Sequence, residues 1–177
     1  YLRTTSALTR TPPSAEENVR IRAYRSNSWT LTPALQQPVT ISAGTTSVPV
    51  RLMISRPNLG SGNRSTEIDI ELSGIGALNN EPITVGGSVL AYTFSVPLSA
   101  TPPTTLGQGT APVLTVRTTN RAIRVYTTYG GTHTQVLLNV DTVINVDSVA
   151  FYDAAYPAGA LITAARPGDT VFLRAVV

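Results

Sequence analysis

Short runs of alternating apolar and polar residues, separated by turns that contain proline or glycine, recur about every ten residues along most of the chain. The run Glu67–Leu72 is the clearest example, because three carboxylates alternate there with three aliphatic residues. A period of two is typical of a strand with one buried face. No stretch of helical length carries a period of 3.6. The pattern predicts an all-β protein.

The number and spacing of these runs predict how the strands are organised. Between residues 18 and 140 they fit a jelly-roll-like antiparallel β-sandwich. Residues 1–17 are rich in Thr, Ser and Pro, and we expect an extended arm or linker there. The strand pattern restarts in residues 141–177, which predicts the start of a second β-unit. The runs expected to form strands are 19–24, 29–31, 39–41, 48–55, 67–72, 90–98, 113–117, 123–126 and 136–140.

Composition narrows the classes of function. Charged residues make up 13% of the chain, which is about half the usual share. All thirteen basic residues are arginines, and they are spread along the sequence. Nucleic-acid binding requires a concentrated basic face with stacking aromatics, so we expect none. The absence of cysteine excludes disulfides and thiolate metal sites. No apolar run reaches the ~20 residues of a membrane-spanning helix.

His133 is the only histidine and therefore the only candidate for the base of a Ser-His-Asp site. It lies in the segment 130–134, Gly-Gly-Thr-His-Thr, where we expect an exposed hairpin tip. There is no Gly-x-Ser-x-Gly motif and no lysine. We expect no catalysis from this chain.

Glu67, Asp69 and Glu71 are the other candidates, because carboxylates on one strand face can hydrolyse glycosides or bind calcium. We interpret them instead as a solvated face, whose charges pair with arginines on a neighbouring strand. The arginines expected as partners are Arg20, Arg22 and Arg51.

Asp141, Asp147 and Asp153 recur every six residues around the expected junction of the two units. Calcium can rigidify such junctions through carboxylates. The sequence lacks a denser acidic cluster there, and we expect these residues to serve turns. We therefore expect no cofactor, with calcium as the alternative.

Aromatic side chains suggest an alternative function, carbohydrate binding by a β-sandwich module. Exposed rings on jelly rolls can stack on sugars, and Trp29, Tyr126 and Tyr129 are the candidate glycan contacts, together with Tyr24. Trp29 follows a polar run and equally fits a core position at the start of a strand.

The C-terminal stretch carries a resemblance. The run 170–177 reads as an apolar strand, and the preceding Pro-Gly-Asp-Thr-Val at 167–171 is a turn into that strand. Together with the segment 143–153, this stretch resembles the opening of immunoglobulin-like repeat domains in large modular bacterial cell-surface proteins. In such proteins a jelly-roll-like sandwich often precedes the repeats. The resemblance implies extracellular structural work.

These observations predict a non-catalytic structural or adhesive module of a bacterial surface protein or extracellular filament. Two strands cannot bury their own apolar face, so we expect one of two arrangements. Either the chain is part of a longer protein, in which residues 141–177 begin an immunoglobulin-like domain, or these residues are a strand-exchanging tail that completes its core with other β-structure. We expect the partners to be other copies or neighbouring domains of the same surface protein, with glycans as the alternative. The assembly residues are predicted to be Val171, Leu173, Ala175 and Val177.

Overall fold

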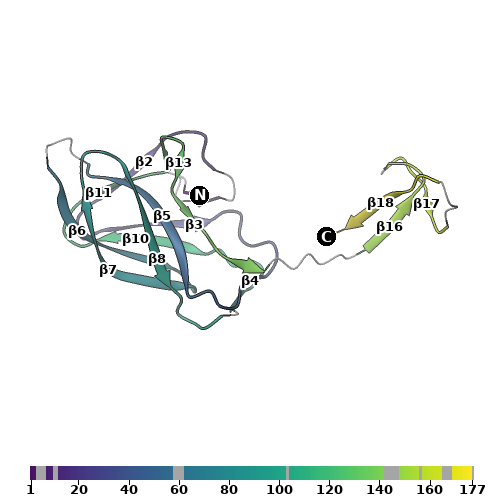
Figure 1. Ribbon diagram of the computed structural model, residues 1–177, viewed down its shortest axis with the longest axis horizontal. Helices are drawn as coiled ribbons and strands as arrows, with labels where there is room; N and C mark the ends of the chain where they lie inside the picture. The colour runs from purple at the N-terminus through teal and green to yellow at the C-terminus, as the bar shows by residue number, and fades with distance from the viewer. Residues whose placement is uncertain are drawn as a thin grey trace. The chain divides into compact units, whose positions relative to one another are not determined.

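The computed structural model describes residues 1–2, 7–9, 12–57, 62–102, 104–141, 148–155, 157–164 and 169–176. These residues form strands, turns and loops, and no helix occurs among them (Figure 1). The chain divides into two compact units, Tyr1–Asp141 and Thr142–Val177. The prediction of an all-β protein is confirmed.

Two main sheets build the first unit. One has the order β1-β3-β10-β6-β7. The other has the order β2-β11-β5-β8, and β14 pairs with the part of the β5 edge that β11 leaves open. The strands of the first sheet are β1 (Ala7–Leu8), β3 (Ser26–Leu31), β10 (Val113–Thr118), β6 (Arg64–Leu72) and β7 (Gly76–Val85). Those of the second are β2 (Asn18–Ile21), β11 (Ile123–Tyr126), β5 (Ser47–Ser55), β8 (Leu90–Pro97) and β14 (Gln135–Val136).

The pairing of the eight principal strands follows a nested order. The first pairs with the last (β2 with β11), the second with the second last (β3 with β10), and then β5 with β8 and β6 with β7. All four pairs are antiparallel. A long hairpin rolled up into two sheets gives this order, which is the jelly-roll arrangement that the strand pattern predicts.

Three short strands and a hairpin complete the first unit. The strands β15 (Val140–Asp141), β4 (Val39–Ile41) and β9 (Thr104–Leu106) form a small sheet in that order. The hairpin consists of β12 (Thr128–Tyr129) and β13 (Thr132–His133). The predicted strand over 136–140 is thus wrong in extent, because β14 and β15 are separate strands that pair with different neighbours.

Alternating residues of the main strands fill the space between the two sheets. On β5, Val48, Val50, Leu52 and Ile54 are all buried, and the aliphatic residues of β6 face them from the other sheet. Trp29 of β3 is fully buried in the same core. Removal of these side chains from water is the main stabilising contribution, worth about 1.5–3 kcal/mol for each large aliphatic residue.

The described residues of the range 1–17 do not form the expected extended arm. Leu2 and Leu8 are buried in the sandwich core, and β1 pairs in parallel with β3. The amide of Thr32 also donates to the carbonyl oxygen of Leu8. The prediction from the Thr, Ser and Pro content was wrong here, because two leucines within a polar segment suffice to anchor it to a core.

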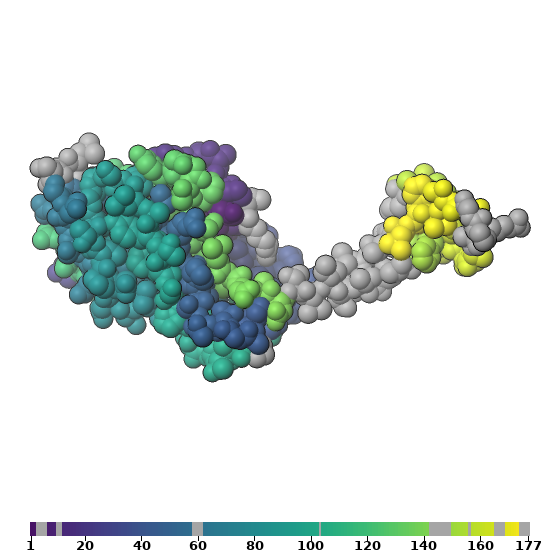
Figure 2. Space-filling model, viewed as in Figure 1, coloured from purple at the N-terminus to yellow at the C-terminus, as the bar shows by residue number. Residues whose placement is uncertain are grey.

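The edge strands β7 and β8 belong to different sheets and approach each other along one side of the sandwich. A bridge joins Gly76 to Leu98 at one end, and the hydroxyl of Tyr92 donates to the carbonyl oxygen of Thr84 at the other. In Figure 2 the atoms of this part of the chain, in teal, form one continuous surface. Contact between the two edges leaves less backbone open to other strands.

A three-stranded antiparallel sheet forms the second unit, in the order β17-β16-β18. Its strands are β16 (Ser148–Tyr152), β17 (Leu161–Ile162) and β18 (Phe172–Val176). The turn after β16 is held by Asp153, whose carboxylate accepts a hydrogen bond of 2.7 Å from the amide of Ala160. β18 contains two of the residues predicted to take part in assembly, Leu173 and Ala175.

Candidate functional site

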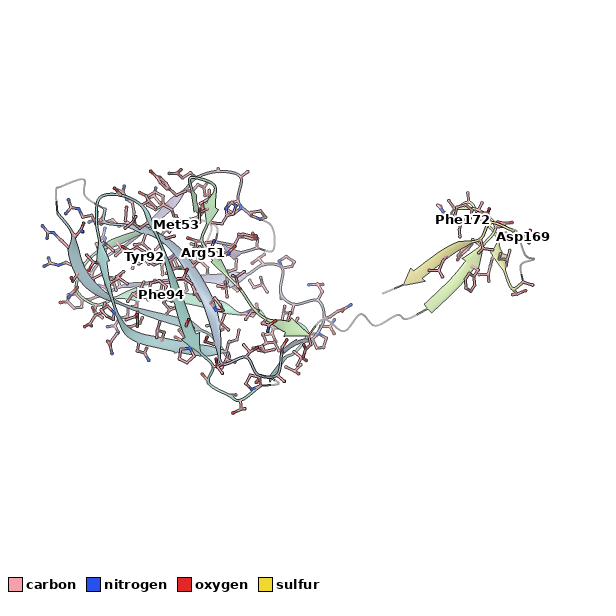
Figure 3. All side chains as sticks on the ribbon, viewed as in Figure 1. Arg51, Met53, Tyr92, Phe94, Asp169 and Phe172 are labelled. Carbon is pink, nitrogen blue, oxygen red and sulfur yellow. The ribbon has the colours of Figure 1, made fainter. Side chains whose placement is uncertain are left out.

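The second unit carries several large apolar side chains that are in contact with water. We call them the apolar surface of the second unit; their exposed fractions are 46% for Phe151, 64% for Leu161, 41% for Val171, 41% for Phe172 and 63% for Leu173. Figure 3 labels Phe172 on β18, and the yellow atoms of β18 lie at the surface in Figure 2. Several exposed hydrophobic residues close together mark an interaction site rather than ordinary surface.

Strand register places these residues on both faces of the sheet. Phe151 lies opposite Leu173 on one side and opposite Ile162 on the other, so these three residues share a face. Tyr152 lies opposite Phe172 and Leu161, and these three share the second face. A hollow of about 240 Å³ opens on the first of these faces, lined by Phe151, Ile162, Thr163, Ala164 and Val171. A sheet that is apolar on both faces requires cover on both.

The backbone of β18 is paired along one edge only. Residues 172–176 pair with β16, and within the described residues no strand pairs with the other edge of β18. Such an edge presents N–H and C=O groups that another strand can bind.

Two of the four predicted assembly residues, Val171 and Leu173, belong to the apolar surface. Ala175 lies on β18 with its backbone opposite Val149, and Val177 lies outside the described residues. Sequence reasoning missed Phe151, Leu161 and Phe172 as members. Phe172 fell between the alternating positions that were singled out, and β17 is too short to give a periodic signal.

The candidate glycan contacts are not brought together. Trp29 is fully buried, so no sugar can stack on it, and this assignment was wrong. Tyr126 and Tyr129 do lie together, with ring centroids 5.8 Å apart. Their planes are inclined by 67°, so the two rings do not form a flat platform for a sugar.

His133 is partly buried on β13 rather than exposed at a hairpin tip. Its ring packs edge-on against Tyr1, with centroids 5.4 Å apart. No carboxylate of the described residues pairs with it. Among the described residues, the ring therefore has no carboxylate to orient it as a Ser-His-Asp site requires.

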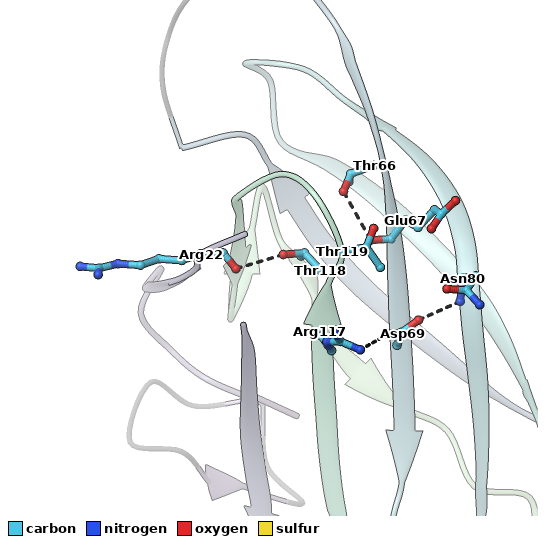
Figure 4. A network of polar contacts seen from close by, with 8 residues as sticks. All are labelled: Arg22, Thr66, Glu67, Asp69, Asn80, Arg117, Thr118 and Thr119. Carbon is cyan, nitrogen blue, oxygen red and sulfur yellow. Dashed lines mark hydrogen bonds and ion pairs between the residues drawn. The ribbon is translucent and has the colours of Figure 1, made fainter. Parts of the chain in front are cut away.

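The three carboxylates of β6 lie on the outer face of their sheet, as the alternation predicts. Glu67 and Glu71 are exposed, whereas Asp69 is half-buried and binds two groups (Figure 4). It accepts a hydrogen bond of 2.8 Å from the amide of Asn80 and forms an ion pair of 3.4 Å with Arg117 of β10. The expected partners Arg20, Arg22 and Arg51 were therefore wrong for Asp69. In the part of the chain that the structure describes, no acidic cluster could hold a metal ion.

The aspartates expected near the junction act separately. Asp141 accepts a hydrogen bond of 2.8 Å from the hydroxyl of Ser42, and Asp153 stabilises its turn as described above. Asp147 lies outside the described residues.

No protein-family model matches the chain, and comparisons with curated proteins and with solved structures found no match either. Over the described ranges, no helix is long and apolar enough to cross a membrane. The function therefore has to be inferred from the residues themselves.

Proposed function

We propose that this protein is a non-catalytic structural and adhesive module of a bacterial surface protein or extracellular filament. In this proposal, the first unit is a rigid sandwich and the second unit binds further β-structure from other copies or neighbouring domains of the same protein. The observation that carries the proposal is the exposure of Phe151, Leu161, Val171, Phe172 and Leu173 on one small sheet.

The energetics of the second unit support this reading. The described residues of the unit Thr142–Val177 form one sheet, with no second layer against which its apolar faces are buried. Leu161 and Leu173 lie on different faces of its sheet, so a partner has to cover both. Full burial of one such side chain contributes about 1.5–3 kcal/mol. Addition of a strand to the open edge of β18 would also satisfy backbone groups.

The immunoglobulin-like resemblance fits the same proposal. An antiparallel sheet with apolar faces is what the opening strands of a sandwich domain present before a second sheet covers them. The extracellular location and the adhesive role follow from this resemblance and remain part of the proposal.

The test is the association state of the intact chain. We expect sedimentation velocity to show concentration-dependent association of the wild-type protein. The double variant Leu161→Asp, Leu173→Asp places a charge on each face, and we expect it to weaken association by about a hundredfold or more, from the loss of two buried leucines.

Leu90→Asp is the matched control, because Leu90 is 51% exposed on β8 of the first unit. This control variant should associate like the wild type. A wild-type chain that stays monomeric at high concentration would contradict binding to other copies. Equal association of the double variant would contradict the role of the apolar surface.

A further inference from the structure

Five arginines from two segments that are distant in sequence, 20–25 and 121–124, gather at one end of the sandwich. We call them the arginine corner, and they lie in or next to two chain crossings between the sheets. The turn 22–25 carries the chain from β2 to β3, and the loop 119–122 carries it from β10 to β11. The members are Arg20, Arg22, Arg25, Arg121 and Arg124.

Hydrogen bonds fix the two crossings side by side. The hydroxyl of Thr118 donates to the carbonyl oxygen of Arg22 at 3.1 Å, and its amide donates to that of Arg25 at 3.2 Å. Thr118 is itself buried, which makes it a rigid link between the crossings. Figure 4 shows the Arg22 side chain extending away from the strands beside this link.

Arg20 and Arg124 face each other directly in the register of β2 and β11. Residues in directly opposed positions have Cβ atoms about 4.5–5.5 Å apart on the same face of the sheet, and like charges there are destabilising. The fold therefore holds Arg20 and Arg124 side by side at a cost in stability. Arg22 follows directly after the end of β2, at the start of the turn 22–25.

No carboxylate compensates these charges in the described structure. The one ion pair between described side chains is that of Arg117 with Asp69, and neither residue belongs to the corner. Glu67 is near, because its carbonyl oxygen accepts from the amide of Thr119, but it forms no ion pair with the five arginines. Guanidinium groups presented in this way match sulfate, phosphate or carboxylate oxygens in geometry.

The arginine corner also contains an exposed aromatic ring. Tyr24 lies between Arg22 and Arg25 in the turn and is 68% exposed. Its φ of 60° is in the left-handed region, which costs a bulky residue about 1–2 kcal/mol. Neither burial nor backbone preference explains a tyrosine at this position, whereas contact with a ligand does.

We propose that the arginine corner binds an acidic polysaccharide, with the arginines on its sulfate or carboxylate groups and the Tyr24 ring against a sugar face. Binding of single-stranded nucleic acid uses several stacking rings along a basic groove. The corner has one exposed ring among its described residues, which favours the polysaccharide. This inference goes beyond the proposed function and does not depend on the second unit.

The test measures binding of the intact chain by calorimetry at several salt concentrations. Heparin and polygalacturonate are the acidic probes, dextran is the uncharged probe, and single-stranded DNA is the competing polyanion. We expect binding to an acidic polysaccharide that weakens as salt rises, and no binding to dextran. Arg22→Ala and Arg124→Ala should each weaken binding by about tenfold.

Arg51→Ala is the matched control, because it removes the same charge from β5, away from the corner. Tyr24→Gly separates binding from folding, since it removes the ring and relieves the left-handed strain. We expect weaker binding from this variant with an unfolding midpoint equal to or above that of the wild type. An independent readout is a rise in the wild-type unfolding midpoint on addition of the polysaccharide.

Four results would overturn the inference. They are no binding to either acidic probe at low salt, tighter binding to single-stranded DNA, equal losses in Arg51→Ala and Arg124→Ala, and wild-type affinity in Tyr24→Gly.

Discussion

Gly76 stands where the backbones of β7 and β8 meet, and the space there admits no side chain. A Cβ atom at this position would overlap the carbonyl oxygen of Pro97, which is backbone and cannot rotate away. We expect Gly76→Ala to lower the free energy of unfolding by about 1–3 kcal/mol, because the two edge strands have to separate. Urea unfolding measures this change.

Gly87 provides the control for that substitution. A Cβ atom there would meet nothing within 4 Å, so Gly87→Ala should change stability by less than about 0.5 kcal/mol. Equal stabilities of the two variants would contradict the close approach of the strands.

Tyr92, on the same edge, makes the free energy of unfolding depend on pH. Burial raises the pKa of its phenol above the ordinary value of 10.0, and its hydroxyl donates to Thr84 (Figure 3). Below pH 10 the phenol is protonated in both the folded and the unfolded chain. At higher pH the unfolded chain loses this proton first, so the free energy of unfolding falls as pH rises through the folded-state pKa.

The variant Tyr92→Phe isolates this effect. At pH 7 it should be less stable by about 1 kcal/mol, because the hydrogen bond is lost. Above pH 10 its stability should fall less steeply than that of the wild type, so that the two curves of urea-unfolding free energy against pH converge. Parallel curves would show that Tyr92 is not responsible.

At the scale of the element, β7 depends on a side chain of its neighbour β6. The register shifts between Ile68 and Ile70, and Asn80 adopts a φ of 55° in this bulge. The amide of Asn80 donates to the carboxylate of Asp69 instead of to the ladder. Asp69 thus stabilises the bulge. The interpretation of this residue as part of a solvated face does not include such a role.

A series of substitutions separates the two contacts of Asp69. Asp69→Ala removes the acceptor of the bulge amide and should cost about 1–2 kcal/mol in urea unfolding. Asp69→Asn keeps an acceptor, and Arg117→Ala removes only the exposed ion pair, so each should cost less than about 1 kcal/mol. If Arg117→Ala were as costly as Asp69→Ala, the ion pair and not the bulge would be the important contact.

The contrast between β6 and β7 also shows what the sequence predicts at this scale. Strict alternation in Glu67–Leu72 predicts β6 and its buried face correctly. Nothing in the sequence analysis predicts β7, because the bulge and Pro82 interrupt the period of two. An edge strand tolerates both features, since one side of its backbone needs no partner within its sheet. The period of two is clear in β6, which has no proline, and is lost in β7, where the bulge and the proline interrupt it.

At the scale of the whole molecule, the composition of the strands predicts the class of fold, but their pairing brings together residues that no local pattern connects. Arg20 and Arg124 lie opposite each other only because the first principal strand pairs with the last. Trp29 is buried because its side chain faces the core between the two sheets. Arginines that are dispersed in the sequence therefore lie together in the arginine corner. The aromatic residues that were candidate glycan contacts, in contrast, do not form a platform for a sugar.

We expect the backbone amides of the two units to exchange with solvent at different rates. Amides of β5 are paired on both edges over a buried core and should exchange with solvent only when the first unit unfolds. Amides of β16 and β18 belong to a sheet with exposed apolar faces and should exchange much faster in dilute solution.

If the apolar surface of the second unit binds another copy, mass action should raise the protection of these amides as protein concentration rises. Hydrogen exchange followed by mass spectrometry, at low and high concentration, measures both quantities on the same peptides. The variant Leu161→Asp, Leu173→Asp should show no such rise, whereas protection of β18 equal to that of β5 in dilute monomer would mean that the second unit is stable without a partner.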